Sequence, residues 1–147
     1  MSGVPLFNSI DIKSISFKNR VIMSPMCQYS AENGHLTNWH KQHYSRFAQS
    51  GLGGAFIEAT AVSPEGRITH GCTGIWDDKF IPDLSEIVKI FKKYNVNIGI
   101  QIGHAGRKAS CDRPIDGAKP LTSQSIETPW EIIAPSSIPM SLDSPEP

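Results

Sequence analysis

Groups able to take part in chemistry follow three apolar segments of this chain. Residues 24–27 (Ser-Pro-Met-Cys) place a hydroxyl, an exposed backbone and a thiol directly after the apolar run 21–23. Ala59 and Thr60 end a second apolar segment, and Gln101 and His104 stand at the end of a third. If the three segments are neighbouring parallel strands, these groups gather at one edge of the sheet.

The thiol of Cys27 allows three interpretations. It belongs to a cofactor cradle, it is a nucleophile, or it packs as a small buried hydrophobe, which is common for free cysteines. A cysteine nucleophile needs a base within reach, and His104 is the only candidate near another strand end. The residues alone leave these interpretations open.

Three further residue types carry open alternatives. The amide of Gln101 both donates and accepts hydrogen bonds, which suits a heterocyclic ring edge and equally suits a core amide bonded to a neighbouring strand. Glu58, in an apolar segment, is either a catalytic carboxylate or a buried, paired structural one. His40 and His43 have metal-ligand spacing on a helix, but no third ligand is evident, so we expect no metal site.

Helix and strand patterns supply the elements that position these groups. Thr37 is a suitable N-cap for a helix over residues 38–49. A second helix is predicted over residues 82–94, where apolar residues recur at i, i+3, i+4 and i+7. Short apolar segments predict strands at 21–23, 54–60 and 96–103. Short strands or turns are expected before residue 20, and loops over residues 62–78 and 108–147.

Strands and helices therefore alternate, which predicts an α/β fold with parallel strands and right-handed crossovers. In such folds ligand groups gather at the carboxyl ends of the strands. Within residues 96–103, strand alternation places Gln101 on the face opposite the aliphatic side chains.

Composition excludes several classes of function. Fourteen Lys and Arg balance 14 Asp and Glu, so the chain has no basic field for nucleic acid or an anionic membrane. No apolar run approaches the roughly 20 residues of a membrane helix. The three cysteines are widely spaced, and no secretory signal pattern opens the chain, so we expect the cytoplasm.

Taken together, the motifs at the strand ends resemble those of the old yellow enzyme family of flavin oxidoreductases. Residues 18–30, around the Ser-Pro-Met-Cys motif, resemble the family's opening segment. The segments that fit the same pattern are 66–69, 74–76, 100–109 and 133–139. The pairing of Ser-Pro-Met-Cys with His-Ala-Gly-Arg-Lys points to the thermophilic-like branch of NADPH dehydrogenases and xenobiotic reductases.

The resemblance implies a (β/α)8 TIM barrel that binds FMN non-covalently and takes hydride from NADPH or NADH. Reduced flavin then passes hydride to a small-molecule activated alkene, such as an enone. The family positions imply flavin contacts from Ser24, Pro25, Met26, Cys27, Ala59 and Gln101. They also imply that Cys27 tunes the flavin redox potential, without acting as a nucleophile, and that Tyr29 faces the substrate.

The resemblance further implies that residues 1–147 are the N-terminal part of a single barrel domain, with only about the first three strands present. Such a barrel takes about 250 residues, and later strands supply the ligands of the substrate carbonyl and the flavin phosphate site. We therefore expect this chain alone to fold poorly, because open sheet edges favour aggregation, and to turn over no substrate. Related enzymes are often dimers or tetramers, so a homo-oligomer is expected of the full-length form.

Two alternatives stay open. One is another FMN barrel, of the dihydrouridine synthase or dihydroorotate dehydrogenase type, although those lack this pair of motifs. The other is a non-catalytic chain that docks with a partner through its open sheet edges.

Overall fold

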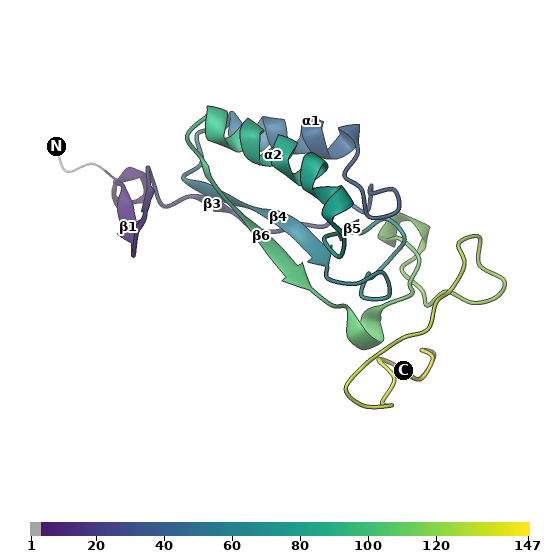
Figure 1. The fold of residues 1–147 in the computed structure, drawn as a ribbon. Coiled ribbons are helices and arrows are strands. Elements are labelled where there is room, and N and C mark those ends of the chain that lie inside the picture. The colour runs from purple at the N-terminus through teal and green to yellow at the C-terminus, as the bar shows by residue number, and fades with distance from the viewer. Residues whose placement is uncertain (1–3) are drawn as a thin grey trace.

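The computed structural model describes residues 4–147, and its centre is a parallel sheet with two helices on one face (Figure 1). Strand β4 (Gly54–Ala61) pairs in parallel with β3 (Ile22–Met23) and with β6 (Asn97–Gly103). Helix α1 (Asn38–Ala48) connects β3 to β4, and α2 (Ile81–Lys93) leads into β6. The alternation of strand and helix expected from the sequence is confirmed.

The first helix begins where the sequence predicts. Thr37 is its N-cap, and a reciprocal pair of hydrogen bonds joins Thr37 to His40. The Nδ1 atom of His40 accepts the Thr37 backbone N–H at 2.9 Å, so one of the unpaired amides at the helix start finds a partner. A histidine thus replaces the usual Glu or Gln of a capping box.

The hydrophobic core lies between the two helices and the sheet. The stripe predicted for α2 is confirmed, because Ile87 and Phe91 are fully buried in it. Ala55 and Ile57 face the same core from β4. The buried members of this core are Met23, Leu36, Tyr44, Ala48, Ala55, Ile57, Ile87, Phe91 and Val96.

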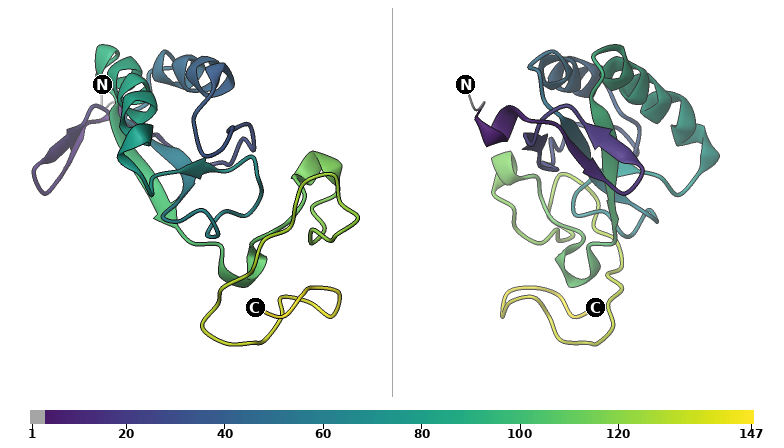
Figure 2. Two further views of the ribbon diagram at one scale, coloured as in Figure 1. Left: turned by 45° about the vertical axis from the view of Figure 1, so that its right-hand side comes forward. Right: turned by 90° about the vertical axis from the view of Figure 1, so that its left-hand side faces the viewer.

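A short hairpin precedes the sheet and packs at the amino ends of the strands (Figures 1 and 2). A 3-10 turn (Pro5–Phe7) leads into the antiparallel strands β1 (Ile10–Ile12) and β2 (Ile15–Phe17). The Asn97 side chain donates a 2.7 Å hydrogen bond to the Ser16 carbonyl, which ties the hairpin to the start of β6. The short strands and turns expected here, at one end of the body, are confirmed.

One strand in the second connection was not predicted. Strand β5 (Thr73–Gly74) pairs with Thr60 and Ala61 at the carboxyl end of β4. Two residues carry no periodicity, and this strand exists only because the end of β4 offers free backbone groups. Beyond β6, residues 104–147 form loops with two 3-10 turns (Gly106–Lys108 and Pro114–Asp116) and extend away from the sheet (Figure 2), and this segment includes the loop expected over residues 108–147.

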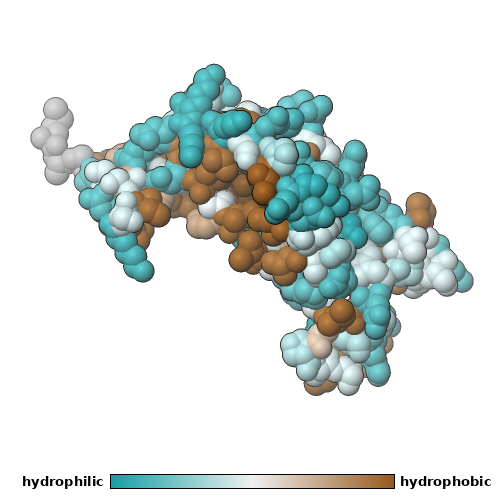
Figure 3. Space-filling view, in the orientation of Figure 1, coloured by the Kyte–Doolittle hydropathy of each residue, from teal (hydrophilic) through white to brown (hydrophobic). Residues whose placement is uncertain are grey.

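Apolar surface is visible along the sheet beneath α2 (Figure 3). Among strand residues, Phe56 is 42% exposed and Ile102 is 62% exposed. Both would be buried if further elements continued the sheet and covered its two faces. Within residues 4–147, neither helix combines the length and hydropathy that a membrane span requires.

Candidate functional site

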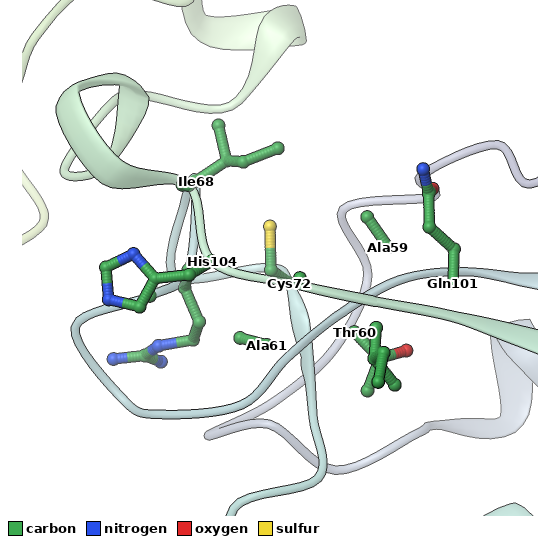
Figure 4. Close-up of a pocket in the computed structure, with 12 residues that line it drawn as sticks. Ala59, Thr60, Ala61, Ile68, Cys72, Gln101 and His104 are labelled. Atoms are coloured by element: carbon green, nitrogen blue, oxygen red, sulfur yellow. The ribbon is translucent and has the colours of Figure 1, made fainter. Parts of the chain in front are cut away.

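A β-bulge in β4 sets the orientation of the site. Ile57 pairs with Ile100 and Ala59 pairs with Gln101, so β4 advances two residues while β6 advances one. Glu58 is therefore the extra residue of the bulge. Beyond it, Ala59 and Gln101 point to one side of the strands and Thr60 to the other (Figure 4).

A cavity of about 200 Å³ lies at the carboxyl ends of β4 and β6. Gln101 and His104 line it together with Ala59 and Thr60, so two of the three strand ends singled out in the sequence meet there. The loop after β4 closes one side, because the Gly66 carbonyl accepts the Ala105 N–H at 2.8 Å. The lining residues are Ala59, Thr60, Ala61, Gly66, Arg67, Ile68, Cys72, Gln101, Ile102, Gly103, His104 and Ala105.

The third strand end, residues 24–27, joins this site through Cys27. Ser24 and Met26 are exposed, whereas Pro25 and Cys27 are half-buried. The pKa of the Cys27 thiol is raised to about 11, chiefly by burial and then by nearby Cys72 and Glu58. Hydrogen bonds with the Ala59 backbone and the Tyr29 side chain act in the opposite direction. Cys27 therefore lies beside Ala59, which in turn pairs with Gln101.

The pKa of the Cys27 thiol bears on one of the earlier interpretations, the nucleophile. A cysteine nucleophile acts as the thiolate and needs a lowered pKa or an adjacent base. The pKa of Cys27 is raised, and no histidine is among the groups that shift it. Meanwhile the Nδ1 atom of His104 accepts the Gly106 N–H at 3.0 Å. The raised pKa disfavours a nucleophile, whereas a cofactor cradle and a small packed hydrophobe both agree with a protonated thiol.

Tyr29 lies between the site and a second cavity. Its backbone has a φ of 52°, in the left-handed region that few non-glycine residues adopt. Burial and the neighbouring Cys27 raise the pKa of its hydroxyl. The second cavity, of about 260 Å³, is lined by Tyr29, Ile68, Thr69, Lys108, Cys111, Asp112, Pro114, Ala118, Pro120, Met140, Ser141 and Ser144.

Glu58 is a structural carboxylate, the second of the two alternatives. It is fully buried, and it lies against α1 beside Tyr44 and His40. His40 is also fully buried and caps its helix, while the His43 ring contacts those of Tyr44 and Phe47. Both histidines thus contribute to the packing and capping of α1.

Cys72 is a site residue that the sequence analysis missed. It is buried, lines the first cavity, and raises the pKa of Cys27. It follows Gly71, whose added Cβ would lie 2.3 Å from the Tyr29 carbonyl oxygen. The Gly71 carbonyl also accepts the Ala31 N–H at 2.9 Å. Only the tertiary contact between these two loops reveals the position, since no pattern surrounds it in the sequence.

Comparisons with known proteins place this chain among flavin oxidoreductases. The sequence model of the NADH:flavin oxidoreductase / NADH oxidase family matches residues 5–137. An NADPH dehydrogenase of Geobacillus thermodenitrificans is 42% identical over 144 residues, which are 97% of this chain and 37% of that protein. The chain spans about a third of the length of the curated relatives it matches.

Solved structures give the same result for the fold. The old yellow enzyme of Pichia sp. AKU4542 superposes with a TM-score of 0.67 and 26% identity, over 72% of this chain and 28% of the other. Morphinone reductase in complex with tetrahydroNAD gives a TM-score of 0.66 and 26% identity, over 73% and 29%. The prediction of the opening of a TIM barrel is confirmed. This chain belongs to the NADH:flavin oxidoreductase / NADH oxidase family.

Proposed function

We propose that the protein carrying this chain is an FMN-dependent NAD(P)H oxidoreductase that reduces activated alkenes such as enones. One observation supports this above the others: Ala59 and Gln101 pair across β4 and β6 at the carboxyl end of the sheet, with Cys27 beside Ala59. The similarity to NADPH dehydrogenases supports NADPH as the reductant, and the nicotinamide in the name of the morphinone reductase complex supports the same cofactor class.

The residues present fit a flavin. A flat ring system needs small side chains beneath it, and Ala59 supplies only a methyl group on that side of the strands. Its pyrimidine edge carries both donors and acceptors, and the exposed amide of Gln101 offers both. The segment after β3 lies at the same edge of the sheet and is partly exposed. It consists of Ser24, Pro25 and Met26.

Each residue then has a role in the proposed reaction. A bound flavin would supply the hydride-transfer chemistry between a nicotinamide and an electron-poor carbon. Gln101 holds and orients the ring, and Cys27, with its thiol protonated at neutral pH, modulates the redox potential. Tyr29 contacts the substrate from the second cavity, because its side chain lines that space.

Four further features belong to the same proposal. Residues 1–147 form the first part of a single barrel domain of the thermophilic-like branch. The protein acts in the cytoplasm and associates as a homo-oligomer. The sequence resemblance supports the branch and the assembly, and the pattern of widely spaced cysteines supports the compartment.

The proposed function is tested with the native protein that carries this sequence. Purified protein is loaded with FMN, and NADPH oxidation is followed with and without 2-cyclohexen-1-one. We expect oxidation that depends on the enone and yields the saturated ketone. A flavin-loaded protein that oxidises NADPH but never reduces the enone would disprove the alkene substrate, and a protein that takes up no flavin would disprove the whole proposal.

A further inference from the structure

Glu58 connects helix α1 to the segment proposed to contact flavin and substrate. Its Oε2 atom accepts a hydrogen bond from the backbone N–H of Gln28 at 2.7 Å. Gln28 lies between Cys27 and Tyr29 in the chain. A bond to this N–H therefore fixes the backbone that carries both of those residues, and a charged acceptor makes it stronger than a neutral one.

Two side chains of α1 lie beside the other carboxylate oxygen. The Tyr44 hydroxyl donates to Oε1 at 3.4 Å and accepts the backbone N–H of Glu58 at 2.9 Å. The Nε2 atom of His40 lies 3.2 Å from Oε1. Because His40 Nδ1 accepts the Thr37 N–H, Nε2 is the ring nitrogen that faces the carboxylate.

The bulge in β4 orients the Glu58 side chain toward Gln28, Tyr44 and His40. Regular alternation along β4 would place Glu58 on the same face as Phe56, which is on the opposite side of the strand from the core. The extra residue instead turns the carboxylate into the helix layer, where it is 0% exposed. Bulges often redirect a side chain next to a functional site.

We propose that Glu58 is a positioning residue, whose buried carboxylate acts through the Gln28 N–H to hold Cys27 and Tyr29 in the arrangement that flavin and substrate require. This inference rests on the proposed function and assigns no contact between Glu58 and the flavin itself. The carboxylate also acts on Cys27 through its charge, which opposes formation of the thiolate.

The test uses the native protein with Glu58→Gln, which keeps the shape and one acceptor oxygen but removes the charge. The first measurement, made without flavin, is the alkylation rate of Cys27 relative to Cys111, which serves as a reference within the same molecule. The charge of Glu58 opposes formation of the Cys27 thiolate, so we expect the ratio to rise by a factor of about two or more when that charge is removed. The second is the flavin midpoint potential of the loaded protein, which we expect to become more positive.

Ile87→Ala is the matched control, because Ile87 is equally buried but lies in α2, outside the contacts of Glu58. We expect it to lower thermal stability while leaving the alkylation ratio and the potential at their original values. If Glu58→Gln yields no folded protein, Tyr44→Phe replaces it, and we expect a smaller change in the same direction. An unchanged alkylation ratio in the folded variant overturns the inference.

The two arms separate this inference from the proposed function. Failure of the unsubstituted protein to bind flavin contradicts the proposed function, while the alkylation ratio still reports whether Glu58 positions Cys27. If the protein binds flavin but Glu58→Gln changes neither the alkylation ratio nor the flavin midpoint potential, only the positioning role of Glu58 is contradicted.

Discussion

Ala59 of β4 lies opposite Gln101 of β6, and both side chains point to the same side of the sheet (Figure 4). This relationship depends on the bulge at Glu58, because without the extra residue Ala59 would face the helix layer with Ile57. The bulge thus does two things at once. It presents a small methyl group beside a polar amide at the strand ends, and it buries the carboxylate that holds the neighbouring segment.

The amide of Gln101 is expected to contribute to flavin affinity but not to folding. Replacing Gln101 by Leu removes a hydrogen-bond donor and an acceptor from an exposed side chain. The substitution should therefore destabilise the flavin-bound protein but not the flavin-free one. We expect flavin affinity to fall by about 1 kcal/mol, or about fivefold, in a fluorescence titration. The control is Gln124→Leu, at an exposed loop position, which should change neither affinity nor melting temperature. Equal affinities for the two variants would contradict this role.

The reactivity of Cys27 is expected to rise only at high pH. Burial raises its pKa from the ordinary 9.0 to about 11, and Cys72 and Glu58 act in the same direction. Between these values the folded protein keeps a proton that the unfolded chain releases, so the free energy of unfolding should fall as pH rises from 9 toward 11. The alkylation rate measured against pH in the flavin-free protein gives the midpoint. A midpoint below 9 would show that the thiol is activated instead.

Gly71 is expected to tolerate no side chain. A Cβ at this position would lie 2.3 Å from the Tyr29 carbonyl oxygen, which is backbone and unable to rotate away. We expect Gly71→Ala to cost about 1–3 kcal/mol of stability in chemical denaturation, as other overpacked sites do. Gly103→Ala is the control, since an added Cβ there meets nothing within 4 Å. Similar losses in both variants would argue against the packing of these two loops.

Trp130 is expected to anchor the long loop that follows β6. Its indole N–H donates to the Glu65 carbonyl at 3.0 Å, and the Arg67 guanidinium lies 5.3 Å from its ring centroid. Trp130→Ala should remove about 1–2 kcal/mol of local stability and speed proteolytic cleavage after residue 110. Ile126→Ala, at a fully exposed position of the same loop, should leave the cleavage rate unchanged. Identical cleavage rates in both variants would exclude the anchor.

The sequence predicts the elements of the sheet and helices well, because their signals are local. Thr37 is recognisable as an N-cap, and the stripe through Ile87 and Phe91 has helical spacing. Each predicted end of these helices and strands agrees with the observed end or differs from it by one residue. Strand β5 escapes prediction because two residues pair only where the neighbouring strand offers a partner.

Some residues of the candidate site can likewise be predicted from local sequence signals, and others cannot. Cys27, Ala59 and Gln101 follow from their places at strand ends, since parallel strands bring those ends together. The role of Glu58 does not follow, because a bulge breaks the period of two on which strand predictions depend. The role of His40 could not be predicted either, because capping through Nδ1 and burial beside Glu58 both result from packing.

We propose above all that this site holds a flavin that a nicotinamide reduces. The most direct measurement is the visible absorption spectrum of the native protein, purified without added cofactor, before and after anaerobic addition of NADPH. We expect an oxidised flavin spectrum that bleaches with NADPH, and release of FMN on denaturation. A colourless protein that remains colourless after incubation with FMN would contradict it.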